Sequence, residues 1–218
     1  MIPSNHWPAF ESVFGWYTKN LFRRRFASVR VRGNLPEPKS PIIMACQHVA
    51  WWDPLVIFLL SRTWFPRGAR HDVMMDEENL KKHSFFRWIG AFGVDRATRA
   101  GSASALRHAL DLLEMPNMRL GIYPQGKQES MDQRPLTNTQ GASWLAARSG
   151  APFATVPVRY EFIEDERPEV FVAIGEPRTV PRDGHRAEPI MTAITEDADG
   201  LRDDVHARRF DRFTIVTA

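Results

Sequence analysis

The chain has 218 residues, of which 43% are hydrophobic and 25% are charged, and its single cysteine is Cys46. These values are typical of a globular protein, and they exclude a disordered tail, a collagen-like chain and a scaffold held by internal disulfides. Because 29 basic side chains oppose 26 acidic ones, the net charge is only +3, and we expect no nucleic-acid partner.

Residues 9–26 are predicted to form an amphipathic helix, because apolar residues recur there at helical spacing and basic residues gather toward its end. Two interpretations remain open. The helix covers the core with its cations at the negative end of the helix dipole, or it docks on an anionic membrane surface. The apolar positions are Phe10, Val13, Phe14, Tyr17, Leu21 and Phe22, and the basic ones are Lys19, Arg23, Arg24 and Arg25.

Membrane-spanning and secretory segments are not predicted. Outside the first helix the longest apolar run is Pro54 to Leu60, and a span needs roughly 18 to 20 residues. Residues 1–26 lack the order of a signal peptide, since the basic cluster follows the apolar residues. We expect a cytoplasmic protein that sits peripherally on the cytoplasmic face of the membrane.

From residue 29 onward, predicted strands alternate with predicted helices of about 10 to 15 residues. This alternation favours an α/β fold in which one domain, residues 29–218, has a mixed central β-sheet flanked by helices and follows an N-terminal amphipathic helix within residues 1–28. Some antiparallel pairing is expected near the C-terminal end. The predicted strands are 29–32, 42–46, 73–75, 93–95, 119–123, 153–160 and 170–174. The predicted helices are 54–65, 77–89, 102–113 with Ser102 as N-cap, 139–149 and 187–209.

The most informative segment is Cys-Gln-His-Val-Ala-Trp-Trp-Asp-Pro, residues 46–54. It places His48 after a buried strand and Asp53 directly before a helix that starts with proline. Residues five apart diverge by about 140° on a regular helix, so the two side chains meet only if the chain turns between them. A carboxylate bonded to one imidazole nitrogen leaves the other free to take a proton. The competing interpretation makes Asp53 an ordinary helix N-cap before Pro54.

The same spacing occurs at His71 and Asp76 and at His206 and Asp211. His71 follows a basic loop, and His206 lies in a charged segment without a preceding strand, so both are predicted to be solvent-exposed. Cys46 is predicted to pack as an apolar residue rather than act as a nucleophile. No metal site is expected, because no second His or Cys stands at ligand spacing near His48.

The segment His48-Val-Ala-Trp-Trp-Asp53 resembles the His-x4-Asp signature of the glycerolipid acyltransferase superfamily, which includes the 1-acylglycerol-3-phosphate acyltransferases. Three further blocks follow in the order of that family, and together the resemblance covers about residues 29 to 175. Phe85 to Arg96 is similar to the second block, which ends in Asp-Arg. Ile122-Tyr-Pro-Gln-Gly126 resembles the Phe-Pro-Glu-Gly block, and Thr155-Val-Pro-Val158 the apolar-Pro-Val block.

The resemblance implies direct acyl transfer from an acyl thioester to a hydroxyl, with acyl-CoA or acyl carrier protein as co-substrate and no permanently bound cofactor. His48 would be the general base and Asp53 its orienter. The turn at Gln125 and Gly126 would bring backbone N–H groups to the developing oxyanion. Arg96 and Lys127 would bind an anionic or polar part of a substrate.

Three departures from the family pattern concern the acceptor. The acidic run Asp76-Glu77-Glu78 stands where the family usually has a cation, Gln125 replaces Glu, and Lys127-Gln128 replaces Thr-Arg. These changes favour an acceptor without a terminal phosphate, such as a lyso-aminolipid or a glycosylated lipid.

Other functions remain open. Within the class the acceptor could be a lyso-ornithine lipid, a lysophospholipid, a glycosylated isoprenoid, or 1-acylglycerol-3-phosphate, which yields phosphatidic acid. A catalytically silent, membrane-associated lipid-binding module is opposed by the intact His48 and Asp53 and favoured slightly by Gln125. A hydrolase is less favoured, because the chain has no Gly-x-Ser-x-Gly elbow.

Overall fold

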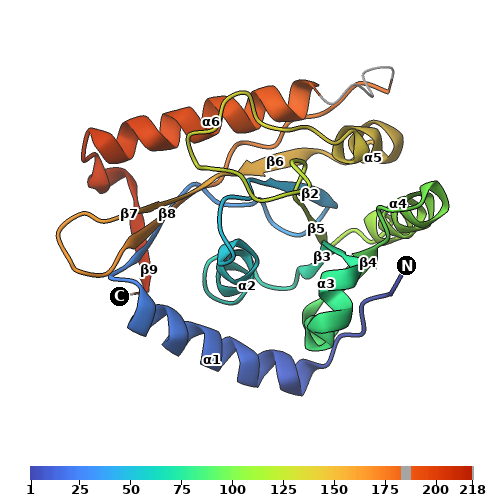
Figure 1. Ribbon diagram of the computed structural model, residues 1–218, viewed down its shortest axis with the longest axis horizontal. Helices are drawn as coiled ribbons and strands as arrows, with labels where there is room; N and C mark the ends of the chain where they lie inside the picture. The colour runs from blue at the N-terminus through green and yellow to red at the C-terminus, as the bar shows by residue number, and fades with distance from the viewer. Residues whose placement is uncertain (183–187, 218) are drawn as a thin grey trace.

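The computed structural model describes residues 1–182 and 188–217. Helices lie on both faces of a β-structure that is divided into two sheets, so the predicted α/β class is confirmed (Figure 1). No helix within these residues is both long enough and apolar enough to cross a bilayer.

The larger sheet has five strands in the order β4-β3-β5-β2-β6, and all four pairings are parallel. Ile43 of β2, for example, pairs with Leu120 of β5 on one side and with Phe153 of β6 on the other. Parallel strands place all their carboxyl ends at one edge, where α/β proteins bind ligands. The strands are β2 (Ile42–Cys46), β3 (Arg70–Asp76), β4 (Ala91–Val94), β5 (Met118–Ile122) and β6 (Phe153–Val156).

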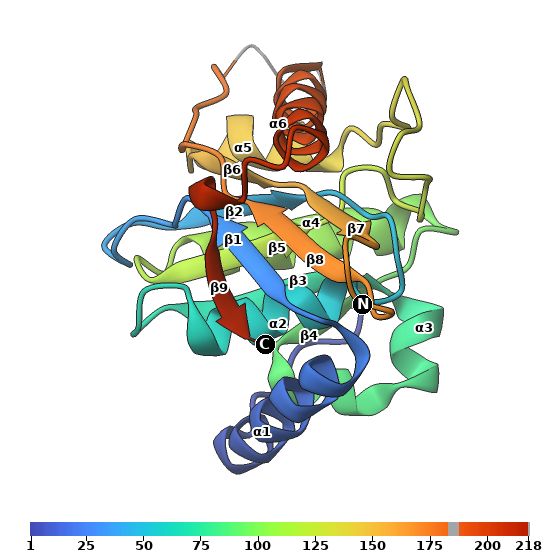
Figure 2. The same ribbon diagram turned by 90° about the vertical axis from the view of Figure 1, so that its left-hand side faces the viewer.

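The smaller sheet has four strands in the order β7-β8-β1-β9 and mixes pairing directions, because β1 is parallel to β8 while β7–β8 and β1–β9 are antiparallel. Figure 2 shows β1, β8 and β9 side by side on the near face. The antiparallel pairing therefore involves the C-terminal strands, as predicted. The strands are β1 (Val29–Arg32), β7 (Val158–Glu161), β8 (Glu169–Ala173) and β9 (Thr214–Thr217).

Two apolar clusters cover the faces of the larger sheet, and β2 alternates between them. Ile43 and Ala45 face the cluster formed with α4, α5 and α6, whereas Ile42, Met44 and Cys46 face the cluster formed with α1 and α2. Both faces of this strand are thus buried, as a parallel sheet requires. The helices are α1 (Pro8–Arg25), α2 (Asp53–Thr63), α4 (Arg99–Leu113), α5 (Gly141–Ser149) and α6 (Glu188–His206).

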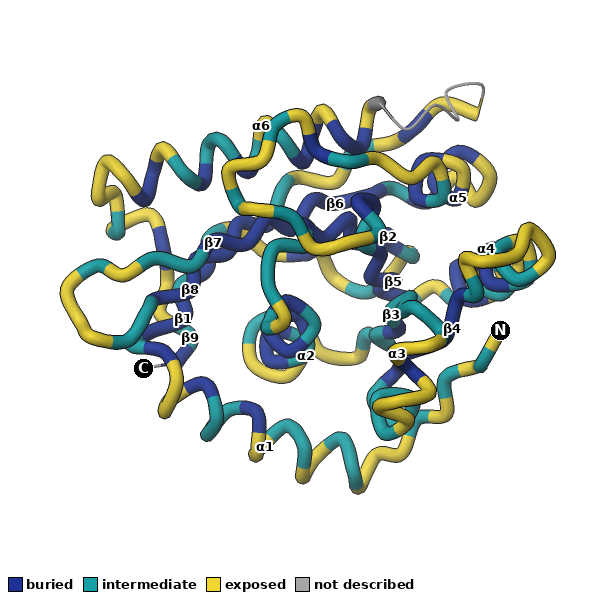
Figure 3. Tube along the Cα trace, viewed as in Figure 1, coloured by how far each residue is buried: buried dark blue, intermediate teal, exposed yellow. Residues whose placement is uncertain are grey.

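Helix α1 is most deeply buried toward its C-terminal end, where Phe22 is fully buried. Nearer its start, the partly buried Phe14 packs on Phe58 of α2 and on Phe85, and Phe10 packs on Trp88. On the outer face, Val13, Trp16 and Tyr17 are 65%, 70% and 51% exposed. Figure 3 shows exposed, intermediate and buried residues alternating along α1. The predicted apolar stripe therefore splits between a face on the protein and a face on solvent.

Several local predictions were wrong. The helix expected over 77–89 is divided into α3 (Glu77–Lys82) and a 3-10 helix, η1 (Ser84–Ile89), and Thr98 rather than Ser102 caps α4. Strand β9 was not predicted. The start of the expected helix at Ala187 lies outside the described residues.

The single strand expected over 153–160 is instead two strands in different sheets. Pro157 stands between β6 and β7 and has no N–H to continue a hydrogen-bond ladder. Val156 accordingly pairs with β2, whereas Val158 pairs with Val172 of β8. The chain thereby passes from the larger sheet into the smaller one.

Candidate active site

The carboxyl edge of the five-stranded sheet gathers the predicted site residues, which are far apart in sequence. His48 follows β2, Gln125 and Gly126 follow β5, and Arg96 follows β4. Hydrogen bonds join these loops directly, since the backbone N–H of His48 donates to Gln125 Oε1 and the Arg96 guanidinium donates to the Gly126 carbonyl. The structure therefore brings all three sequence blocks to one place.

His48 and Asp53 meet across a tight turn. His48 Nδ1 lies 2.8 Å from Asp53 Oδ2, and the backbone N–H groups of Val49 and Ala50 donate to the same oxygen at 2.6 and 2.8 Å. The carboxylate thus bonds backward to the preceding loop, and it makes no N-cap bond to α2. The interpretation of Asp53 as an ordinary N-cap is wrong, and its charge still suits the positive end of α2.

The side chains of His48 and Asp53 differ in their exposure to solvent. The Asp53 side chain is 1% exposed, while that of His48 is 19% exposed. Among the described residues, no hydrogen-bond partner engages His48 Nε2. A buried carboxylate that fixes Nδ1 and an accessible Nε2 are the geometry that a general base requires.

Tyr160 is a partner of Asp53 that the sequence did not reveal. It lies on β7 in the smaller sheet, and its hydroxyl donates to Asp53 Oδ1 at 2.7 Å. Burial, and then the negative charge of Asp53, raise the pKa of Tyr160 well above its usual value, so the phenol remains a donor. Both carboxylate oxygens of Asp53 are therefore hydrogen-bonded.

Tyr123 and Cys46 form the inner wall behind His48. The Tyr123 ring lies 4.5 Å from the His48 ring, centroid to centroid. Cys46 is fully buried, and burial together with the Asp53 charge raises the pKa of its thiol. A thiol that stays protonated is a poor nucleophile, which agrees with the apolar packing predicted for Cys46.

Gln125 is buried at 1% exposure and has a second partner besides His48. Its Nε2 donates to Glu129 Oε2 at 3.0 Å. The sequence predicted no role for Glu129. The one feature of the sequence that links it to the site is its position four residues after Gln125.

Gly126 and Arg96 define the turn after β5. Gly126 has a φ of 71°, which favours glycine, and an added Cβ would lie 3.0 Å from Arg96 Nη1 and from Thr139. Its N–H donates to the Tyr123 carbonyl at 3.0 Å and so serves the turn itself. Within the described residues, the N–H groups of Gln125 and Lys127 make no hydrogen bond to protein.

Each of the two cations at this edge lies beside a carboxylate. Arg96 Nε lies 3.4 Å from Asp76 Oδ2, and Lys127 Nζ lies 3.5 Å from Glu129 Oε1. Asp76 also caps α3, and Glu77 pairs with Lys81 at 3.0 Å. Arg96 and Lys127 are 51% and 64% exposed, so both can reach a substrate.

The other two His-x4-Asp segments lie elsewhere and form no such pair. His206 is 58% exposed, as predicted. His71 is only partly exposed, rather than fully exposed as predicted, because it pairs with Arg119 of β5 and stacks on Phe65. Burial lowers the pKa of His71 to about 4. No cluster of three or more metal-ligating side chains occurs in residues 1–182 and 188–217.

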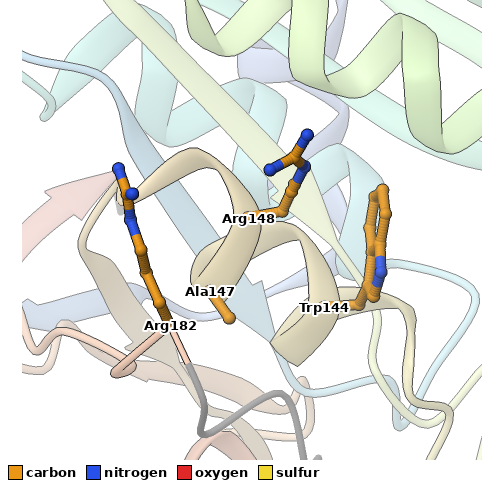
Figure 4. A pocket seen from close by; sticks show the side chains of 4 residues that line it. All are labelled: Trp144, Ala147, Arg148 and Arg182. Atoms are coloured by element: carbon orange, nitrogen blue, oxygen red, sulfur yellow. The ribbon is translucent and has the colours of Figure 1, made fainter.

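A separate surface cavity of about 260 Å³ lies on α5, between Trp144, Ala147, Arg148 and Arg182. Figure 4 shows the two arginines and the tryptophan around it. None of its lining residues belongs to the carboxyl edge described above.

Comparison with known proteins adds a family model and a curated relative. The model of the Acyltransferase family matches residues 28–161, more than half of the chain. The 1-acyl-sn-glycerol-3-phosphate acyltransferase of Streptococcus pneumoniae (strain ATCC BAA-255 / R6) is 25% identical over 130 residues. That match spans 58% of this chain and 44% of the relative, so the aligned region covers less than half of the relative's length.

Among solved structures, the 1-acyl-sn-glycerophosphate (LPA) acyltransferase PlsC from Thermotoga maritima is similar, with a TM-score of 0.59. The superposition covers 88% of this chain and 79% of that chain, at 20% sequence identity. At this identity the likeness concerns the fold.

Proposed function

Because this chain belongs to the acyltransferase family, we propose that it is an O-acyltransferase that moves a fatty acyl group from an acyl thioester to a hydroxyl of a lyso-lipid or lipid-like acceptor. The observation that carries the proposal is the 2.8 Å contact between His48 Nδ1 and the buried Asp53 carboxylate, with Nε2 accessible. Acyl-CoA and acyl carrier protein are both donors that fit the reaction.

The proposed reaction is a direct transfer. His48 Nε2 takes the proton of the acceptor hydroxyl as the oxygen attacks the thioester carbonyl, and Asp53 stabilises the imidazolium that forms. The tetrahedral intermediate then breaks its carbon–sulfur bond, and His48 returns the proton to the departing thiolate. The products are an ester and a free thiol.

The oxyanion of that intermediate needs hydrogen-bond donors. In this proposal they come from the turn after β5, where the N–H groups of Gln125 and Lys127 have no protein acceptor within the described residues. Gly126 supports this role through its left-handed backbone rather than through its own N–H, which is already donated to Tyr123.

The proposed acceptor carries no terminal phosphate. A phosphomonoester is bound by several free donors with net positive charge. Here the two nearby cations each have a carboxylate partner, Asp76 for Arg96 and Glu129 for Lys127. A lyso-aminolipid or a glycosylated lipid has no terminal phosphate, so its binding does not require several unpaired cations at this edge.

The second candidate acceptor is 1-acylglycerol-3-phosphate, and it is favoured by the activity named for the Streptococcus pneumoniae relative. The deciding experiment offers lysophosphatidic acid and phosphate-free lyso-lipids in parallel, with one acyl donor. The proposal expects the higher kcat/KM for a phosphate-free acceptor. A preference of about tenfold for lysophosphatidic acid, about 1.4 kcal/mol in the transition state, would overturn the phosphate-free proposal.

Peripheral binding to the cytoplasmic face of the membrane is part of the proposal. The exposed face of α1 carries Val13, Trp16 and Tyr17, and the exposed cations Arg23–Arg25 follow at its C-terminal end. Trp51, in the turn between His48 and Asp53, is 61% exposed and packs on Trp52, which contacts Phe22 of α1. Aromatic residues beside cations suit an anionic lipid surface close to the acceptor.

The membrane proposal is tested by sedimentation with phosphatidylcholine vesicles, with and without phosphatidylglycerol. Wild type should sediment with the anionic vesicles, less so at high salt, and the double variant Trp16→Ser/Tyr17→Ser should stay in solution. Trp144→Ser on α5 is the matched control and should sediment like wild type. Equal sedimentation of the α1 variant and wild type would assign α1 to a purely structural role.

A catalytically silent lipid-binding module is the alternative from another class. It is tested by incubating the full chain with acyl-CoA or acyl carrier protein thioesters and a panel of lyso-lipids. Ester formation that disappears in His48→Ala supports the enzyme. Lipid binding with no ester from any donor supports the silent module.

A further inference from the structure

Gln125 and Glu129 together enclose the backbone of His48. Gln125 Oε1 accepts the His48 N–H at 2.6 Å, and the backbone N–H of Glu129 donates to the His48 carbonyl at 3.0 Å. Gln125 Nε2 donates to Glu129 Oε2 at 3.0 Å and closes the arrangement. The two polar backbone groups of His48 are therefore held by one short segment of the loop after β5.

The Glu129 carboxylate is the anchor of that loop. It is 7% exposed and accepts from Gln125, from the Thr137 N–H at 3.0 Å, from the Thr137 hydroxyl and from Lys127. Burial raises its pKa, but the hydrogen bonds outweigh burial and lower the pKa to about 2. Glu129 is thus ionised at every working pH and can only accept hydrogen bonds.

An ionised Glu129 explains why residue 125 is glutamine where the similar block of the family has glutamate. Gln125 must accept from His48 and donate to Glu129, and an amide does both at neutral pH, whereas an ionised carboxylate can only accept. A carboxylate at position 125 would lie about 3 Å from a second carboxylate with no donor between them, which is repulsive. The replacement is therefore matched to Glu129.

We propose that Gln125 and Glu129 act as one positioning pair, which fixes the His48 backbone and the loop over residues 125–137 relative to each other. The proposal rests on the acyltransferase function given above and adds residues that act through His48. It also reverses the significance of Gln125, because the glutamine belongs to a working site and is not a sign of lost activity.

The test is a double-mutant cycle on the full chain: wild type, Gln125→Glu, Glu129→Gln and the double variant. At pH 8, Gln125→Glu should lower kcat by about 10- to 100-fold with little change in KM, and it should lower the melting temperature. The double variant restores one donor between the side chains, but its amide N–H then faces the Thr137 N–H, so it should recover only part of both losses. Gln133→Glu makes the same change at an exposed position of the loop and should behave like wild type.

The pH profile separates positioning from a simple loss of structure. As pH falls toward 5, the carboxyl group of Gln125→Glu takes a proton and can again donate to Glu129, so its kcat relative to wild type should rise. Wild-type kcat for Gln125→Glu at pH 8, or a kcat relative to wild type that does not rise as pH falls, would overturn the pair.

Failure of the pair and failure of the proposed function give different results. If wild type transfers no acyl group, the function fails, and the melting temperatures of the four proteins still test the pair. If wild type is active and His48→Ala is not, while Gln125→Glu matches wild type in rate and melting temperature, the function stands and the pair fails.

Discussion

Residues 48–53 and residues 71–76 have the same His-x4-Asp spacing and opposite structures. In the first segment the chain turns and the side chains meet at 2.8 Å. The second segment is strand β3, where a rise of about 3.3 Å per residue separates residues five apart by about 16 Å. The comparison teaches that the spacing acquires meaning only from the backbone between the two residues.

The two histidines also differ in what surrounds them. His48 has a carboxylate on one nitrogen and an accessible second nitrogen, whereas Nδ1 of His71 is buried and has no hydrogen-bond partner among residues 1–182 and 188–217. The two aspartates differ likewise, because Asp53 bonds to the imidazole and Asp76 caps α3. Substitutions at matched positions can therefore separate chemistry from packing.

The largest expected effect is on turnover when the base is removed. His48→Ala should lower kcat by about 1000-fold or more, about 4 kcal/mol, because no other group takes the acceptor proton. His71→Gln and His206→Ala should retain turnover near that of wild type under the same conditions. Initial rates with one thioester and one active acceptor measure the turnover of each variant. Near-normal turnover by His48→Ala would contradict the role of His48 as the base.

The second effect concerns the aspartates. Asp53→Asn should lower kcat by about 100-fold, because an amide no longer fixes the imidazole tautomer or stabilises its charged form. With a phosphate-free acceptor, Asp76→Asn should change kcat little, since asparagine is an equally good N-cap for α3 and the ion pair of Asp76 with Arg96 is exposed. Steady-state kinetics combined with melting curves check both variants. If Asp76→Asn lowered kcat as much as Asp53→Asn does, the two aspartates would not differ in their importance for catalysis.

A third effect is the pH dependence of stability caused by His71. Its folded pKa is about 4, below the usual 6.5, so the unfolded chain binds more protons and stability falls as pH falls below about 6.5. Between pH 7 and pH 5 this loss is about 2 kcal/mol. His6, whose pKa is raised chiefly by its hydrogen bond to Asp72, acts in the opposite sense.

Urea unfolding of wild type and His71→Gln at pH 7 and pH 5 isolates the contribution of His71. The variant should lose less stability than wild type between the two pH values, by about 2 kcal/mol. Because His6 is present in both proteins, its contribution cancels. Equal losses in both proteins would show that His71 titrates normally in the fold.

The smallest expected effect concerns the hydrogen bond that Tyr160 donates to Asp53. Tyr160→Phe removes the donor to Asp53 Oδ1 and should lower kcat by roughly tenfold, about 1.4 kcal/mol, with KM unchanged. Tyr123→Phe removes a buried hydroxyl that has no hydrogen-bond partner within the described residues, so it should change kcat less. A larger loss in Tyr123→Phe would reverse the roles given to the two phenols.

The sequence by itself determined the α/β class, most strands and helices, and the family. These features depend on local pattern: the buried run Ile42–Cys46, the helix that begins at Asp53 and Pro54, and motif blocks in a fixed order. The sequence also distinguished His48 from the other histidines by its preceding strand, and the parallel sheet order then placed the blocks at one edge.

Only the tertiary structure decided which other groups reach the site. Tyr160 contacts Asp53 because Pro157 ends one hydrogen-bond ladder and sends the chain into the second sheet. Glu129 and Gln125 acquire their roles from the approach of the loop after β5 to the turn after β2. His71 is partly enclosed because it pairs with Arg119 of β5 and stacks on Phe65. Such contacts join residues distant in sequence, so no local periodicity or spacing encodes them.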